Sequence, residues 1–270
     1  MNENIAPKYF KEYLDQLVTF IDSFPKSNRN NKIDTKYCLE QICYVLSTGI
    51  SWNHLRYIKC HYTTIYKRFV YWTKLGIFEK FWNIIITEYI DKQLFLDPLH
   101  FKTIYIDCSM IKNNHGRECT GPNHMDRFRK STKVSMICDK NKVPLVAEFV
   151  KGNIADSNTI EQTLDSLKIL RLNNRFNNYL AADKGYIIDK ERFNNIYNIT
   201  RIKLIAQRRR NQKHKLKPKE EKHLLDRYKI ENTFCRLDKF SRIKCRNESS
   251  LDSYKSFNYM AMIVITIPFI

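Results

Sequence analysis

The 270-residue sequence predicts a mixed α/β protein, in which an all-helical N-terminal part precedes a domain with a mixed central sheet. Apolar residues recur at helical spacing up to about residue 97. Beyond Pro98, strand-like runs alternate with helical ones. Hydrophobic residues make up 43% of the chain, which is enough to bury a core. We therefore expect two domains, residues 1–97 and residues 98–270.

The N-terminal part contains four predicted helices, at 9–21, 37–47, 63–75 and 77–96. Gly49 and Gly76 follow the second and third helices and fit helix ends. A short turn separates these two helices, and the third carries Lys67 and Arg68 among tyrosines. This order is typical of a helix-turn-helix module that reads DNA, but an ordinary helical bundle with a charged surface gives the same pattern. Both interpretations stay open.

The C-terminal part has a recognisable element order. Strands are predicted at 103–108, 132–139, 143–150, 179–182 and 202–206. Helices are predicted from 156 to about 170, from about 186 to 197 and from 222 to about 240. Three strands followed by helix, strand, helix, strand and helix match an RNase H-like fold, in which a parallel strand follows a crossover helix.

Three acidic residues stand at suggestive places in this order. Asp107 lies in a strand, where aspartate is disfavoured and a buried charge must be paired or hold a metal. Asp183 ends the strand that neighbours the first in such a fold, and Glu231 projects from the last long helix towards the same edge. Converging carboxylates repel unless cations lie between them. Two Mg²⁺ or Mn²⁺ ions suit such oxygen ligands and phosphodiester chemistry, so we expect these residues to be catalytic and metal-binding.

Each carboxylate also has a plain structural explanation. Asp107 fits a buried, ion-paired residue, and Asp183 fits a turn at a strand end. Glu231 fits a solvated helix position that pairs with Arg227, four residues earlier.

The charge of the chain points to a polyanionic partner. It has 47 Lys and Arg against 28 Asp and Glu, a net charge of +19, and a pI near 9.5. Nucleic acid is the simplest partner for such a protein, although a solubility-driven excess of lysine is an alternative. The basic segments also fit a solvated hairpin and loop or, in a eukaryotic host, a nuclear-localisation signal. The predicted DNA-contacting residues are Lys67, Arg68, Arg129, Lys130, Lys133, Arg208, Arg209 and Arg210.

The cysteines and the C-terminus indicate the compartment. Eight cysteines without a Cys-x-x-Cys pair give little support for zinc. Together with the missing signal peptide they suggest a reducing compartment. We expect a cytoplasmic, nucleoid-associated protein, or a nuclear one in a eukaryotic host. The apolar tail at 257–270 is short for a membrane span and predicts a core helix, and its abrupt end also fits a truncated reading frame.

Five stretches of sequence carry a family resemblance. They are YCLEQICYVLSTGISWNHLRYIKCHYTTIYKRFVYWTKLGIFE, YIDCSMIK, RKSTKVSMICDKNKVPLVAEFVKGNIADS, YLAADKGYIID, and IAQRRRNQK with RYKIENTFCRLDKFSRIKCRNE. In this order, over nearly the whole chain, they resemble DDE transposases of the IS5/IS4 insertion-sequence group. In some relatives a tyrosine lies three residues before the arginine and a lysine seven after the glutamate. Leu224 and Asp238 stand there instead, with Lys239 one residue on, which is nearer the IS5 branch.

The resemblance implies a function and further site residues. It implies that Asp107, Asp183 and Glu231 hold the metals, and that Arg227, Lys239 and Arg242 contact transposon-end DNA. Such a protein binds the ends of an insertion element, cleaves them and transfers the strands to target DNA by a cut-and-paste route. Joining two ends implies at least a homodimer. The alternatives are a decayed or domesticated DNA-binding protein without activity, and an RNase H-like nuclease of another class.

Overall fold

The computed structural model describes residues 8–25, 33–55, 59–168, 170, 178–208 and 216–270, and they form two compact units. The first unit contains the chain up to Tyr89 together with Asn114–Glu118 and Leu237–Ile270. The second contains Ile90–Asn113 and Cys119–Arg236. The units therefore differ from the predicted boundary at residue 97, because the end of the chain groups with the N-terminal helices.

The first unit is helical, and the four predicted N-terminal helices are confirmed. Asp34 caps α2 by accepting a hydrogen bond from the Tyr37 N–H, and Gly49 ends the helix with a φ of 71°. α4 continues past the unit boundary into the second unit. The elements are α1 (Lys8–Asp22), α2 (Thr35–Thr48), the 3₁₀ turn η2 (Trp52–His54), α3 (Tyr62–Lys74), α4 (Ile77–Leu96), α9 (Ser241–Lys244), the two-residue strand β7 (Cys245–Arg246), α10 (Leu251–Thr266) and η6 (Ile267–Phe269).

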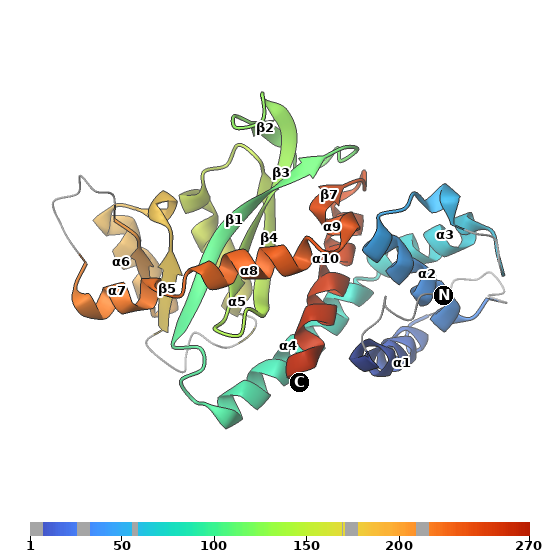
Figure 1. Ribbon diagram of the computed structural model, residues 1–270, viewed down its shortest axis with the longest axis horizontal. Coiled ribbons are helices and arrows are strands. Elements are labelled where there is room, and N and C mark those ends of the chain that lie inside the picture. Colours follow the sequence, from blue (N-terminus) through green and yellow to red (C-terminus); the bar gives the residue numbers. More distant parts are fainter. Residues whose placement is uncertain (1–7, 26–32, 56–58, 169, 171–177, 209–215) are drawn as a thin grey trace. The chain divides into compact units, whose positions relative to one another are not determined.

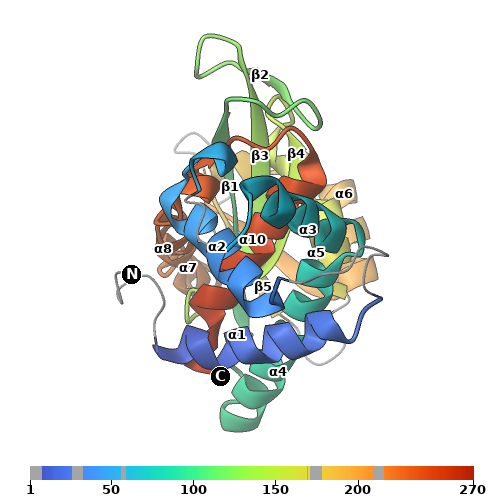
Figure 2. The same cartoon turned by 90° about the vertical axis from the view of Figure 1, so that its right-hand side faces the viewer.

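An aromatic cluster joins α10 to the N-terminal helices. Helices α10 and α3 lie close together (Figure 2). The Phe257 ring of α10 stacks on Phe69 of α3 with ring centroids 4.5 Å apart, and the Trp52 ring centroid lies 5.4 Å from that of Phe69. The C-terminal tail is therefore a core helix, as predicted, and it packs in the core of the first unit. Among the described residues, no helix combines the length and the apolar character that crossing a membrane requires.

The second unit is built on the mixed sheet that the element order predicts (Figure 1). β1 runs antiparallel to β3, and β3 antiparallel to β4. β5 runs parallel to β1, and β6 parallel to β5. This order, β4-β3-β1-β5-β6, is that of an RNase H-like fold. The strands are β1 (Thr103–Asn113), β2 (Gly121–Asn123), β3 (Arg129–Cys138), β4 (Pro144–Lys151), β5 (Asn178–Ala182) and β6 (Ile202–Ala206).

The helices of the second unit follow the predicted order with one difference. The single long helix predicted at 222–240 is wrong, because the chain forms two helices with a turn between them. Asp226 stands in this turn and pairs with Lys229, and aspartate favours helix starts over helix interiors. The elements are η3 (Asp156–Thr159), α5 (Ile160–Lys168), η5 (Lys184–Tyr186), α6 (Lys190–Thr200), α7 (Pro218–Leu224) and α8 (Tyr228–Leu237).

Candidate active site

The parallel pairing of β1 and β5 brings two of the predicted carboxylates to one end of the sheet. Tyr105 lies beside Ala181 in this ladder. Asp107 and Asp183 each follow two residues later, and residues two apart share a face of an extended chain. Asp183 is held in place by the Gly185 N–H, which donates a hydrogen bond to its Oδ1 over 2.7 Å.

The third carboxylate reaches the same place from α8. Arg227 precedes this helix, and its Nη2 lies 2.9 Å from Glu231 Oε1. The other guanidinium nitrogen, Nη1, lies 3.4 Å from Asp107 Oδ2. The ion pair between Glu231 and Arg227, which was the structural alternative to a catalytic role for Glu231, is therefore present. Because Arg227 also contacts Asp107, it links the two carboxylates. Arg227 stands in the turn between α7 and α8, which the sequence did not predict.

The electrostatic environment of Asp107 favours a positive neighbour. Burial is the main cause that raises the pKa of its carboxyl, to about 6. The negative charges of Asp183 and Asp156 also act to raise this pKa, whereas the hydrogen bond from the Cys108 N–H and the charge of Arg227 act to lower it. Its side chain is 21% exposed. A carboxylate in such surroundings gains free energy from any cation that comes within reach.

Asp156 is a fourth acidic side chain near this site, and the sequence suggested for it only a helix cap. The Lys133 ammonium of β3 lies 2.6 Å from its Oδ1 and also donates to the Ile154 carbonyl. A Cβ built on Gly185 would lie 2.9 Å from Asp183 Oδ1 and 3.5 Å from Asp156 Oδ2. The two carboxylates therefore flank the same glycine. The sequence held one sign of this pair: Lys133 is a charged residue among apolar residues of a predicted strand, and a buried charge requires a partner.

The donor set fits a divalent cation. Carboxylate oxygens are the ligands that Mg²⁺ and Mn²⁺ prefer. The Arg227 guanidinium already places positive charge between Asp107 and Glu231, so this pair of carboxylates accommodates a cation. In the described part of the chain, no three His, Cys, Asp or Glu side chains are arranged to hold a metal as they stand. Instead, the Arg227 guanidinium contacts both Asp107 and Glu231.

Apart from Arg227 and Arg242, the predicted DNA-contacting residues fall into four groups. The first group is exposed to solvent and consists of Lys67, Arg129, Lys130, Arg208 and Lys239. Arg68 is half-buried, with Nη1 3.2 Å from Cys38 Sγ. Arg209 and Arg210 lie outside the described residues. Lys133 is buried against Asp156, so its predicted contact with DNA is corrected to an internal ion pair.

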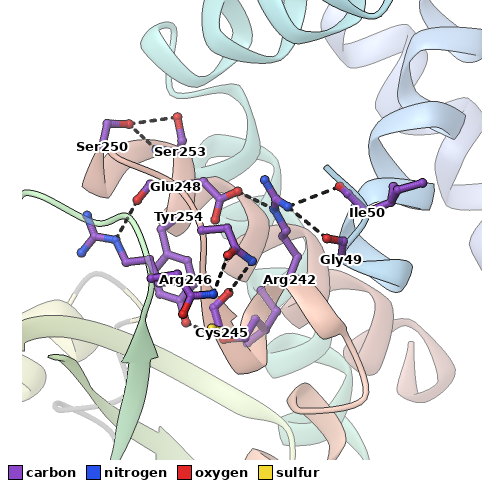
Figure 3. Close-up of polar contacts among 12 residues, drawn as sticks. Gly49, Ile50, Arg242, Cys245, Arg246, Glu248, Ser250, Ser253 and Tyr254 are labelled. Atoms are coloured by element: carbon purple, nitrogen blue, oxygen red, sulfur yellow. Dashed lines mark hydrogen bonds and ion pairs between the residues drawn. The ribbon is translucent and has the colours of Figure 1, made fainter. Parts of the chain in front are cut away.

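Arg242 also requires a correction, because it is buried in the first unit (Figure 3). Its Nε lies 2.5 Å from Glu248 Oε1, with side chains that are 6% and 4% exposed. Its Nη1 donates to the carbonyls of Gly49 and Ile50. A guanidinium that is paired and covered in this way stabilises the fold and is not available to a phosphate.

The strand order and the acidic edge define a class of protein, the RNase H-like enzymes that cut and join phosphodiester bonds. Residues 102–265 match the family model described as "Transposase DDE domain", and residues 15–82 match "Putative transposase of IS4/5 family (DUF4096)". The chain belongs to the DDE transposases, in the IS4/5 group. It is a transposase. DDE transposase domains cleave DNA and transfer its strands, and they generally use divalent metal ions. The family inferred from the sequence motifs is confirmed.

Solved structures with distant similarity include two that contain Mos1. "Crystal structure of a pre-cleavage Mos1 transpososome" shares 11% identity over 98% of this chain and 87% of that chain, with a TM-score of 0.30. "Crystal structure of the Mos1 Strand Transfer Complex" shares 10% identity over 97% and 86% of the two chains, also with a TM-score of 0.30. The chain matches none of the curated proteins.

Proposed function

We propose that Asp107, Asp183 and Glu231 are the catalytic carboxylates of this transposase, and that they hold two Mg²⁺ or Mn²⁺ ions. The observation that carries the proposal is the arrangement of Asp107 and Asp183 at neighbouring parallel strands, with Glu231 joined to Asp107 through Arg227. When bound, divalent ions lower the pKa of an attacking water or hydroxyl and polarise the phosphate.

The surrounding residues prepare this site. Gly185 fixes the Asp183 carboxylate through its N–H, and Lys133 holds Asp156 beside it while balancing one negative charge. Arg227 offers a planar guanidinium, which pairs well with phosphate oxygens. We assign it to the DNA backbone at the cleaved bond. It would exchange its carboxylate partners for the phosphate.

The reaction consists of two displacements at phosphorus. Water attacks the phosphodiester at the element end, the bond to the 3′ oxygen breaks, and this oxygen leaves as a 3′-hydroxyl. The 3′-hydroxyl then attacks a phosphodiester of the target DNA in line, which forms the new joint and releases a target 3′-hydroxyl. Neither step needs an oxidant or a nucleotide cofactor. Because two ends must be joined, we propose a homodimer as the active assembly.

DNA would be held by basic residues of both parts of the chain. We assign residues 1–97 to a helical domain that binds the element ends, and residues 98–270 to the catalytic domain. Lys67 of α3 belongs to the helical domain. Exposed lysines and arginines on phosphates give affinity that does not depend on sequence and falls with salt. The residues assigned to this role in the catalytic domain are Arg129, Lys130, Arg208, Arg209, Arg210, Arg227 and Lys239.

The test is metal-dependent cleavage of a duplex that carries the inverted repeats flanking the gene. Asp107→Asn, Asp183→Asn and Glu231→Gln should each reduce the cleavage rate by at least three orders of magnitude, roughly the scale seen when one member of a catalytic unit is removed. Fluorescence anisotropy should show that each variant still binds the duplex. Asp165→Asn, which changes an exposed carboxylate on α5, is the matched control and should cleave normally.

Two results would count against this assignment. Cleavage at the wild-type rate by Asp107→Asn would remove that residue from the site. A wild-type protein that binds the duplex but never nicks it with Mg²⁺ or Mn²⁺ would leave only a non-catalytic DNA-binding protein.

A further inference from the structure

The hairpin of β2 and β3 ends in an apolar tip that the site described above does not use. We call residues 124–128 the hairpin tip. Figures 1 and 2 both show this hairpin extending beyond the rest of the sheet. Met125 in the tip is 93% exposed and Phe128 is 65% exposed. Large apolar side chains displayed in this way at a protruding turn are unfavourable in water and indicate a contact surface.

The hairpin tip has a defined shape. The Asn123 carbonyl accepts hydrogen bonds from the N–H groups of Asp126 and Phe128, at 3.1 and 2.9 Å. The Asn123 side chain is buried, and its Oδ1 accepts from the Met125 N–H over 2.9 Å. The His124 ring meets the Phe128 ring edge-on, with centroids 4.9 Å apart. Met125 and Phe128 are therefore presented by an ordered turn.

The backbone of the hairpin tip is strained in order to present these side chains. Arg127 and Phe128 have φ values of 47° and 59°, in the left-handed region that costs a residue other than glycine free energy. Strain of this kind concentrates at sites that contact ligands. The cost is not offset by burial, because the Phe128 ring remains largely in solvent.

The base of the hairpin is anchored firmly to the sheet. A Cβ on Gly121 would lie 2.1 Å from Asn153 Oδ1, and one on Gly152 would lie 2.1 Å from Ser131 Oγ. The two segments can pack this closely only because both residues are glycine. The Gly152 N–H also donates to the Ser131 carbonyl. The tip is thus a projection on a rigid support.

The charge around the apolar tip selects nucleic acid as its partner. Arg127 lies within the tip, and Arg129 and Lys130 follow it directly, all three exposed. Asp126 is the one acidic residue between 121 and 131. An apolar wedge of Phe or Met flanked by basic side chains is the combination with which proteins enter a base step of duplex DNA while holding its phosphates. A hydrophobic protein partner would not require this positive surround.

We propose that the hairpin tip is a DNA wedge, in which Met125 and Phe128 insert between base pairs of a bound duplex while Arg129 and Lys130 hold its backbone. The proposal deepens the proposed function, since the duplex is the one held at the carboxylates. Asp107 pairs with Met136 of β3, and this strand begins directly after Phe128, so that Met136 lies eight residues beyond Phe128. At about 3.3 Å per residue the wedge is roughly 25 Å from the carboxylate, or about seven to eight base pairs of duplex.

The test measures DNA bending and affinity without cleavage. The double variant Met125→Ser/Phe128→Asn removes the wedge, and asparagine tolerates the left-handed backbone better than phenylalanine. A duplex with dyes at both ends, with EDTA present, should show energy transfer rising when the full-length wild-type protein binds, because the wedge bends it. The double variant should bind on the order of tenfold more weakly and bend the duplex no further than free DNA. Its thermal melting should equal that of the wild type.

Two matched variants separate the wedge from its surroundings. Phe95→Ser removes another exposed phenylalanine, 88% exposed on α4, and should change neither affinity nor bending. Arg129→Ala/Lys130→Ala should lower the slope of log affinity against log salt by about 0.9 for each phosphate that the variant no longer neutralises. The wedge variant should leave this slope unchanged.

Several outcomes would overturn the wedge. Wild-type affinity and bending in the double variant would do so, as would wild-type protein that binds without bending the duplex. Either result leaves the assignment of the carboxylates intact, because no cleavage is measured. Cleavage at the wild-type rate by Asp107→Asn, which would overturn the assignment of the carboxylates, would in turn leave the bending result unchanged, so the two proposals fail separately.

Discussion

At the scale of single residues, two arginines from the same predicted DNA-binding segment have different partners. Arg227 lies between Asp107 and Glu231 and keeps part of its surface exposed. Arg242 is enclosed with Glu248. The motif that suggested both roles specifies residue types and spacing. It does not specify which side chain the fold will cover, because burial depends on contacts with distant parts of the chain.

The buried pair gives a stability prediction. Arg242→Met should lower the free energy of unfolding by about 3–5 kcal/mol, because Glu248 would remain buried without its partner. Urea denaturation followed by circular dichroism measures this change. The matched control is Lys239→Met, at an exposed position, which should change the stability by less than about 0.5 kcal/mol.

A second variant separates the ion pair from general packing. Arg242→Met/Glu248→Leu should recover most of the stability, because apolar side chains often replace a buried pair without cost. A single Arg242 variant as stable as the wild type would contradict the structural role and return Arg242 to the candidates for DNA binding.

At the scale of elements, the sequence predicted the strands and helices well wherever a period of apolar residues was long enough. It missed β2, which has three residues and no such period, and it joined α7 to α8 across the turn at Asp226. It identified α10 as a core helix but not which core it joins. Helical spacing reports that one face is apolar, and it carries no information about the surface that covers this face.

The placement of α10 leads to a test at this scale. Phe257→Ala should destabilise the first unit by about 3–5 kcal/mol, because it removes a fully buried ring that stacks on Phe69. Hydrogen exchange followed by mass spectrometry should show faster exchange in α3, with little change in β1 and β5. Leu180→Ala, which truncates a buried side chain of β5, should give the reverse pattern. Equal loss of protection in α3 and β1 for both variants would contradict two compact units.

At the scale of the whole molecule, the acidic site is contained in one unit of a strongly basic chain. The net charge of +19 predicts a polyanionic partner but does not locate its contacts. The sequence led to the expectation that Asp107 and Asp183 lie near each other, because the predicted strand order makes their strands neighbours, and β1 and β5 do pair in parallel. The metal-binding role of Asp107, Asp183 and Glu231 stays a prediction. It could not find the pairing of Lys133 with Asp156 or the exposed hairpin tip, since both depend on contacts between segments far apart in the chain.

The central claim is that Asp107, Asp183 and Glu231 bind divalent ions together. The most direct measurement is the anomalous scattering of Mn²⁺ in crystals of the protein grown with Mn²⁺ and a duplex end. The account predicts Mn²⁺ bound to carboxylate oxygens of Asp107, Asp183 and Glu231, with Arg227 moved from Asp107 to a phosphate. Mn²⁺ bound only elsewhere, with Arg227 still between Asp107 and Glu231, would contradict it.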